Sequence, residues 1–68
     1  MNRQSVSSSQ ITSVGHDGTM LEVEFNNGAV YQYEGVSVET FEELINSPSI
    51  GAYFNENIKH GKYSYRRV

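Results

Sequence analysis

The stretch Leu21-Glu22-Val23-Glu24-Phe25-Asn26-Asn27-Gly28-Ala29-Val30-Tyr31-Gln32-Tyr33 predicts a β-hairpin against which the rest of the chain must pack. Its apolar residues Leu21, Val23 and Phe25 alternate with polar ones, which is typical of a strand with one buried and one solvated face. An Asn-Gly pair then marks the turn. The hairpin therefore indicates which side of the sheet faces the core.

Two registers are compatible with this turn. A two-residue type I′ turn would place Gln32 and Glu34 on the core face. A three-residue loop over 26–28, with Gly28 in the left-handed conformation as a bulge, moves both to solvent. We predict this bulged register because it groups the tyrosines with the aliphatic residues. It gives the cross-strand pairs Phe25–Ala29, Val23–Tyr31 and Leu21–Tyr33.

The flanking segments predict a small α+β fold built on an antiparallel meander. A β-prone run at 11–14 and a turn at Asp17-Gly18 precede the hairpin. Ile11 and Val14 are three residues apart, so burying both requires a bulge near Gly15 or a position at the sheet edge. The predicted three strands span about 10–16, 19–26 and 29–35.

Two short helices are predicted to cover one face of this meander. Ser37 and Ser49 are suitable N-cap residues, and Pro48 separates the two segments because proline cannot continue a helix. The helices then span 37–46 and 49–58. Their expected buried stripes are Val38, Phe41, Leu44 and Ile45 in the first helix, and Ile50, Phe54 and Ile58 in the second.

Length and composition indicate one domain over 1–68 without disulfides, because the chain has 68 residues and no cysteine. Residues 1–9 end in three serines and are expected to form a loose arm. No apolar run is long enough for a signal peptide or a membrane span. These features predict a cytoplasmic protein that does not act at a membrane.

Candidate catalytic and metal-binding groups are few. Ser13, His16 and Asp17 have the residue types of a hydrolytic triad, but Asp17-Gly18 indicates a turn with His16 in solvent, and a triad needs a sheltered base. His60 is expected at a helix C-terminus that ends at Gly61. Two isolated histidines match no recognised metal site. We therefore predict a protein that is not an enzyme and has no cofactor, metal or small-molecule substrate.

Charge is distributed unevenly along the chain. The net charge is -3 and all eight acids lie between 17 and 56, whereas residues 59–68 contain four cations and no acid. Two tyrosines alternate in this segment, which fits either a short edge strand or an extended tail. Aromatic rings stack on unpaired bases while Lys and Arg neutralise phosphates. The composition predicts a nucleic-acid-binding site formed by Lys59, Lys62, Tyr63, Tyr65, Arg66 and Arg67.

A purely structural interpretation of the same segment is also open. The tyrosines could pack on the sheet, with the cations paired to the acidic helix face or left in water. A function of another class is protein–protein interaction or self-association through a sheet edge or the acidic helix face. The residues alone leave these alternatives open.

Several short motifs occur together in this chain: Val6-Ser7-Ser8-Ser9, Leu21-Glu22-Val23-Glu24-Phe25, Asn27-Gly28, Tyr31-Gln32-Tyr33, Tyr53-Phe54-Asn55 and Tyr63-Ser64-Tyr65-Arg66-Arg67-Val68. In this order they resemble the KTSC domain family, which occurs at the C-terminus of some lysyl-tRNA synthetases and as small stand-alone bacterial proteins. The resemblance implies an RNA-binding role, with single-stranded or structured RNA as partner, and brings no catalytic residue. The predicted register would make the family's Y-x-Y motif part of the core.

Overall fold

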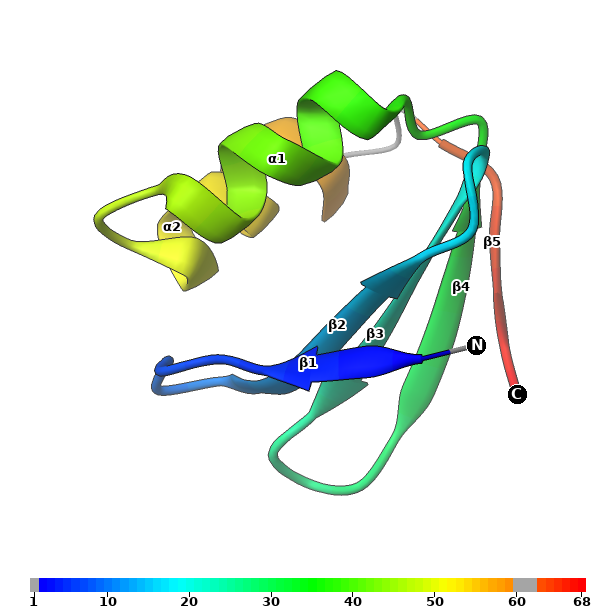
Figure 1. The fold of residues 1–68 in the computed structure, drawn as a ribbon. Coiled ribbons are helices and arrows are strands. Elements are labelled where there is room, and N and C mark those ends of the chain that lie inside the picture. Colours follow the sequence, from blue (N-terminus) through cyan, green and yellow to red (C-terminus); the bar gives the residue numbers. More distant parts are fainter. Residues whose placement is uncertain (1, 60–62) are drawn as a thin grey trace.

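A computed structural model describes residues 2–59 and 63–68, which form a five-stranded antiparallel sheet and a layer of helices (Figure 1). The strand order in the sheet is the order in the sequence. The strands are β1 (Arg3–Ser5), β2 (Ile11–His16), β3 (Met20–Phe25), β4 (Val30–Glu34) and β5 (Tyr65–Arg67). The helices are α1 (Val38–Asn46), α2 (Ile50–Phe54) and the π-helix η1 (Asn55–Lys59).

The β3–β4 hairpin has the predicted bulged register. Gly28 N donates to Phe25 O at 2.9 Å, and Phe25 N donates to Ala29 O at 2.8 Å. Gly28 has a φ of 90°, which a residue without a Cβ adopts at little cost. The pairs Val23–Tyr31 and Leu21–Tyr33 are formed as expected.

The prediction of three strands was incomplete, because one further strand lies at each edge of the sheet. The loose arm predicted for 1–9 is wrong for Arg3–Ser5, which pairs with β2. Gly15 permits this approach, since a Cβ there would lie 2.4 Å from Asn2 O. An ion pair of 2.8 Å between Arg3 and Glu22 also anchors the strand. At the other edge, β5 pairs with β4.

A bulge in β2 allows both Ile11 and Val14 to be buried although they are three residues apart. Its predicted position near Gly15 was wrong. The register shift lies between Ile11 and Ser13, and both apolar residues are buried. Thr12 is the additional residue, and its hydroxyl donates to Asn26 Oδ1 at 2.7 Å. A local polar contact thus places the bulge next to the hairpin turn.

Both predicted N-caps are present. Ser37 Oγ accepts from Thr40 N at 3.1 Å, and Ser49 Oγ accepts from Ala52 N at 3.3 Å. The second predicted helix is α-helical only through Phe54 and continues as the π-helix η1. No helix within 2–59 or 63–68 is long and apolar enough to cross a membrane.

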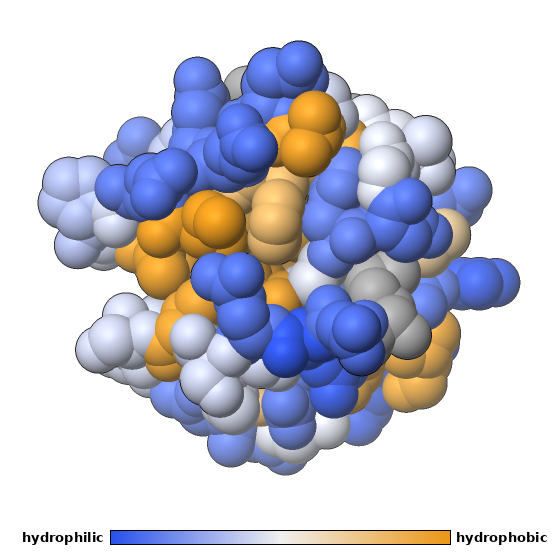
Figure 2. All heavy atoms as spheres, in the orientation of Figure 1, coloured by the Kyte–Doolittle hydropathy of each residue, from blue (hydrophilic) through white to orange (hydrophobic). Residues whose placement is uncertain are grey.

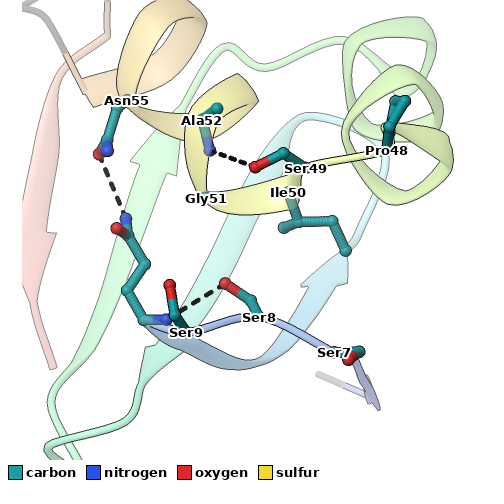
Figure 3. A pocket seen from close by; sticks show the side chains of 10 residues that line it. Ser7, Ser8, Ser9, Pro48, Ser49, Ile50, Gly51, Ala52 and Asn55 are labelled. Atoms are coloured by element: carbon teal, nitrogen blue, oxygen red, sulfur yellow. Dashed lines mark hydrogen bonds between the residues drawn. The ribbon is translucent and has the colours of Figure 1, made fainter.

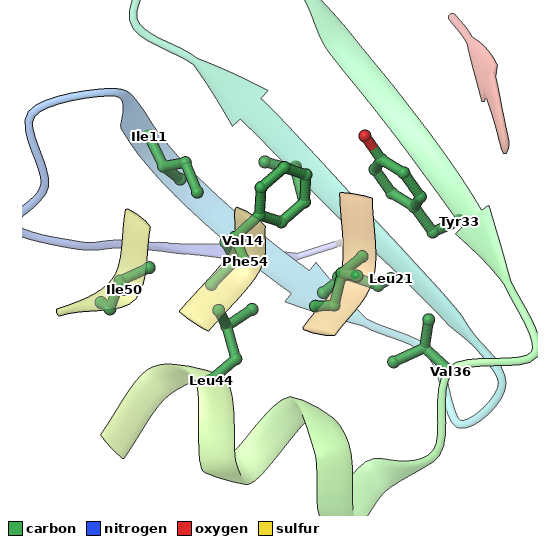
Figure 4. Close-up of a cluster of buried hydrophobic side chains, with 10 residues drawn as sticks. Ile11, Val14, Leu21, Tyr33, Val36, Leu44, Ile50 and Phe54 are labelled. Carbon is green, nitrogen blue, oxygen red and sulfur yellow. The ribbon is translucent and has the colours of Figure 1, made fainter. Parts of the chain in front are cut away.

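The core lies between the helices and one face of the sheet (Figure 4). Leu44 of α1 points toward Phe54, which is fully buried, and Tyr33 lies on the sheet side with its hydroxyl directed away from Leu44. The ring centroids of Phe54 and Tyr33 are 5.5 Å apart in an edge-to-face arrangement, which is favourable. The predicted stripe Ile50, Phe54 and Ile58 is buried.

The stripe predicted for α1 was only partly correct. Leu44 is buried, and Phe41 and Ile45 are partly buried against the core. Val38 is 45% exposed because it occupies the first turn. Figure 2 shows apolar residues in the seam between α1 and the sheet, with hydrophilic residues above and below it.

Candidate functional site

An aromatic and basic groove of about 360 Å³ lies beside β5, on the same face of the sheet as the helices. Strands β4 and β5 contribute to it, together with the β3–β4 turn and the end of η1. We call it the β5 groove. Its lining residues are Phe25, Asn27, Ala29, Tyr31, Tyr33, Lys59, Tyr65 and Arg67.

Strand pairing explains why the aromatic residues gather here. Tyr33 pairs with Tyr65 and Tyr31 with Arg67, and residues two apart in a strand share a face. The ring of Tyr31 lies 5.9 Å from that of Tyr65 and 5.8 Å, edge-on, from that of Phe25. Tyr65 is 61% exposed, so its ring is accessible to a ligand.

The floor of the groove is Tyr33, which is only 5% exposed. Burial raises the pKa of its hydroxyl to about 12, and the neighbouring Tyr31 and Tyr65 act in the same direction. Tyr33 is therefore a neutral, largely apolar surface at neutral pH. Of the two tyrosines in the Y-x-Y motif, it belongs to the core, whereas Tyr31 is half-buried at the groove.

Two cations border this aromatic surface. Lys59 is the last residue of η1 and is exposed, and Arg67 lies in β5. Asn57 Nδ2 donates to Tyr53 O at 3.2 Å and so braces the helical turn before Lys59. π-helical turns are rare and occur frequently at functional sites. Within residues 2–59 and 63–68, only Arg3 makes an ion pair, which leaves both groove cations available to an anion.

Two of the remaining predicted site residues, Tyr63 and Arg66, do not line the groove. Arg66 lies on the opposite face, where its Nη2 and Nε donate to Gln32 Oε1 at 3.0 and 3.2 Å. Tyr63 is half-buried and packs against the core. Lys62 lies outside the described residues. The structure therefore separates Tyr63 and Arg66 from the predicted site: Tyr63 packs against the core before β5 begins, and alternation along β5 turns Arg66 to the face opposite Tyr65 and Arg67.

Sequence reasoning missed Phe25, Asn27 and Tyr31 as groove residues. Two alternating patterns could have indicated the groove: Tyr31 and Tyr33 share a face of one strand, and Tyr65 and Arg67 share a face of the other. These alternations become one surface only when β5 is known to pair with β4. The sequence did not specify that long-range pairing.

His16 is not in solvent as predicted, but half-buried between the sheet and α1. Its Nδ1 accepts from Gly18 N at 3.1 Å, so its Nε2 carries the proton and donates to Val36 O at 2.6 Å. The ring also stacks on Phe41 with centroids 5.1 Å apart. Both ring nitrogens are thus occupied by structural contacts. His60 and Gly61 lie outside the described residues.

Ser13 and Asp17 also have structural partners. Ser13 Oγ donates to Glu24 Oε1 at 2.9 Å. Asp17 accepts from the amides of Thr19 and Met20, and these bonds hold the pKa of its carboxyl below the usual value. Neither side chain contacts His16 in a triad. Among the described residues, no three His, Asp or Glu side chains lie where they could hold a metal ion.

A second cavity, of about 510 Å³, lies between residues 7–10 and the start of α2 (Figure 3). Its walls are polar but uncharged. Gln10 Nε2 donates to Asn55 Oδ1 at 3.2 Å, and Ser8 Oγ accepts from Gln10 N at the same distance. The bond to Asn55 joins the N-terminal segment to the helix layer, and the bond to Ser8 holds a turn within that segment.

Comparison with known proteins shows the family. The family model for the KTSC domain matches residues 7–65. An uncharacterised protein of Stutzerimonas stutzeri is 40% identical over 70 residues, covering 100% of this chain and 99% of that one. A lysine–tRNA ligase of Trichormus variabilis is 46% identical over 48 residues, which are 71% of this chain but only 8% of the ligase.

A solved structure agrees with these matches. The crystal structure of a KTSC domain protein from Yersinia pestis is similar with a TM-score of 0.91 and 40% identity, covering 98% of this chain and 96% of that one. The sheet with helices on one face is thus shared along nearly the whole of both chains. By the family match and by this likeness in sequence and fold, the chain belongs to the KTSC domain family.

Proposed function

We propose that this domain binds single-stranded RNA through the β5 groove, without catalysing a reaction. The observation that carries the proposal is the position of Lys59 and Arg67 beside the exposed ring of Tyr65. Stacking on an aromatic ring with nearby cations on the backbone is the usual way in which proteins bind single strands. The similarity to a segment of a lysine–tRNA ligase supports a ligand of this class.

The proposed division of roles follows from the geometry. Tyr65 and Tyr31 offer ring faces to a base, while Lys59 and Arg67 contact the flanking phosphates. Tyr33 supports both rings from below and is too buried to stack itself. Lys62, which lies outside the described residues, stays proposed as a further phosphate contact on the basis of its charge alone. Arg66 and Tyr63, which face elsewhere, are not part of this revised site.

Electrostatics limit the affinity that this site can give. The chain has a net charge of -3, so its long-range field does not attract RNA, and binding depends on the local cations. For single strands, each neutralised phosphate lowers the slope of log K against log salt by about 0.7. Lys59 and Arg67 alone give an expected slope of about -1.4, and a contact from Lys62 would make it about -2.1.

A titration of labelled 12-nucleotide RNA, followed by fluorescence anisotropy at several salt concentrations, tests the proposal. The affinity should fall as salt rises. Tyr65→Ala should weaken binding about 5- to 100-fold, because a base–aromatic stack contributes about 1–3 kcal/mol. The matched control is Tyr53→Ala, which removes a tyrosine from α2 outside the groove. Absence of binding at low salt, or equal effects of the two variants, would refute the proposal.

Self-association through the edge of β5 is the second candidate function. All three residues of this strand are exposed, and only β4 pairs with it among the described strands. An unpaired strand edge is a template for pairing with another chain. Sedimentation velocity over a range of protein concentrations distinguishes the two: a dimer that forms without RNA favours self-association, and a monomer excludes it.

A further inference from the structure

We propose that Gln32 is a positioning residue of the β5 groove. It lies on the face of the sheet without helices, which we call the outer face, and its side chain holds β5 in the register that brings Tyr65 and Arg67 into the groove. This role rests on the proposed function. It adds to that function a residue that faces away from the ligand.

Strand β5 is a segment that can open locally. It is three residues long, each of its residues is exposed, and among the described strands only β4 pairs with it. Two backbone hydrogen bonds of 2.9 Å bracket the strand, from Glu34 N to Ser64 O and from Val68 N to Val30 O. Short exposed segments open at a low cost in free energy. The shape of the groove therefore depends on the contacts that fix β5 to β4.

The register of β5 determines which of its side chains reach the groove. In the observed register Arg66 lies directly opposite Gln32. Because successive residues of a strand face opposite sides, a slip by one residue would turn Tyr65 and Arg67 out of the groove and Arg66 into it. A cross-strand pair on the outer face that fits the observed register therefore helps to specify the site.

The hydrogen bonds of Gln32 have one direction across the sheet. Its Oε1 accepts from Arg66 Nη2 at 3.0 Å and from Arg66 Nε at 3.2 Å, and its Nε2 donates to Glu22 Oε1 at 2.8 Å. A guanidinium only donates and a carboxylate only accepts. The side-chain amide of Gln32 therefore satisfies both neighbours in this orientation and in no other.

Glu22 gives Gln32 a fixed anchor in the middle of the sheet. The side chain of Glu22 is 12% exposed, and its second oxygen, Oε2, accepts from Arg3 Nη1 at 2.8 Å. The carboxylate is thus held by Arg3 from one side and by Gln32 from the other. Through Gln32, Arg66 is tied to a group that is itself held in place.

Gln32→Met tests this role without a change in charge or in the residues that line the groove. Methionine has a similar length but only a weakly accepting sulfur. The amides of Glu34 and Val68, which report on the β4–β5 pairing, should exchange with solvent about 2- to 10-fold faster, because a hydrogen-bonded cross-strand pair is lost. The amide of Phe25 in the β3–β4 hairpin should keep its rate.

The matched control is Gln4→Met, which makes the same substitution in β1 at the opposite edge of the sheet. It should leave the exchange of Glu34 and Val68 unchanged. A general loss of stability would instead accelerate exchange at Phe25 as well, and would contradict a role confined to β5.

Two substitutions of Arg66 test the link from strand position to binding. Both Arg66→Gln and Arg66→Met remove one positive charge. The side-chain nitrogen of glutamine is as many bonds from the backbone as Nε of arginine, so Arg66→Gln keeps a donor for Gln32 whereas Arg66→Met does not. In the RNA titration, Arg66→Met should bind about 2- to 5-fold more weakly than Arg66→Gln, the effect of one net hydrogen bond. The two salt slopes should be equal, because neither variant alters a groove cation.

The outcomes separate this role from the function on which it rests. If the wild-type protein binds no RNA at low salt, the proposed function fails, and the exchange rates still decide whether Gln32 holds β5. If exchange at Glu34 and Val68 is the same in Gln32→Met as in Gln4→Met, the positioning role is refuted whether or not RNA binds. Equal RNA affinities of Arg66→Gln and Arg66→Met would refute the dependence of binding on this contact. Faster exchange in Gln32→Met together with the weaker binding of Arg66→Met confirms the role.

Discussion

Arg66 and Arg67 are consecutive in β5 but act on opposite faces of the sheet. Arg66 donates to Gln32 Oε1 at 3.0 Å on the outer face, whereas Arg67 pairs with Tyr31 in register and lines the groove. Gln32 in turn donates to Glu22 Oε1 at 2.8 Å, so Arg66 belongs to a polar network across the sheet. The basic end of the chain is therefore divided between structure and the candidate site.

The buried hydroxyl of Tyr33 predicts a loss of stability at alkaline pH. Its pKa is raised from 10.0 to about 12 in the folded state, so the neutral phenol is favoured by folding. The resulting stabilisation is complete below pH 10 and is lost as the pH rises toward 12. We expect urea unfolding to show a decrease of about 2 kcal/mol between these limits.

Tyr33→Phe provides the control for this pH dependence. The variant keeps the ring but has no ionisable group, so its loss of stability over the same interval should be smaller. Tyr53, whose pKa is also raised to about 12, contributes equally to both proteins and cancels in the comparison. If the free energy of unfolding falls with pH equally in wild type and Tyr33→Phe, ionisation of Tyr33 does not cause the alkaline loss of stability.

The glycines at 15 and 51 should respond to alanine in opposite directions. At Gly15 a Cβ would lie 2.4 Å from Asn2 O, so Gly15→Ala must displace β1. At Gly51 a Cβ would meet Gln10 at 3.4 Å, an ordinary contact, and alanine favours the helix by about 1 kcal/mol. Gly15→Ala should therefore destabilise the protein, whereas Gly51→Ala should stabilise it.

Hydrogen exchange measures the local effect of Gly15→Ala directly. The amides of Arg3–Ser5 that pair with β2 should lose protection, while those of the β3–β4 hairpin keep theirs. Retained protection in β1 would show that the strand tolerates the added methyl group. The close approach of Asn2 O would then not require glycine at position 15.

Leu44 and Val38 test the revised position of the α1 stripe. Leu44 is fully buried, so Leu44→Ala should lower the free energy of unfolding by about 2–5 kcal/mol. Val38 is 45% exposed, so Val38→Ala should change the free energy of unfolding by less than about 0.5 kcal/mol. Chemical denaturation measures both. A large loss at Val38 would restore the original prediction of a four-residue stripe.

Local patterns predicted the centre of this fold well. The alternation from Leu21 to Phe25 and the Asn-Gly turn were enough for the hairpin register, and Ser37 and Ser49 for the helix starts. Each of these features depends on residues close in sequence. Register, turn and caps therefore follow from short-range chemistry.

The edges of the sheet and the groove could not be predicted in the same way. Strands β1 and β5 are three residues long, and all of their residues are exposed. No hydrophobic pattern therefore distinguished β1 from a loose arm, or decided between the edge strand and the extended tail that the sequence left open at 65–67. Their pairing depends on a close approach at Gly15 and on a partner strand distant in sequence. The groove combines Tyr31 with Arg67 across that second pairing, and so remained hidden.

Comparing Arg67→Ala with Arg66→Ala in the RNA titration tests the central claim most directly. The two variants lose the same charge at adjacent positions, so long-range electrostatics change equally and only the face differs. We predict that Arg67→Ala weakens binding and reduces the steepness of the salt dependence by about 0.7, while Arg66→Ala leaves that slope unchanged. Equal slopes in the two variants, or a larger loss with Arg66→Ala, would contradict RNA binding in the β5 groove.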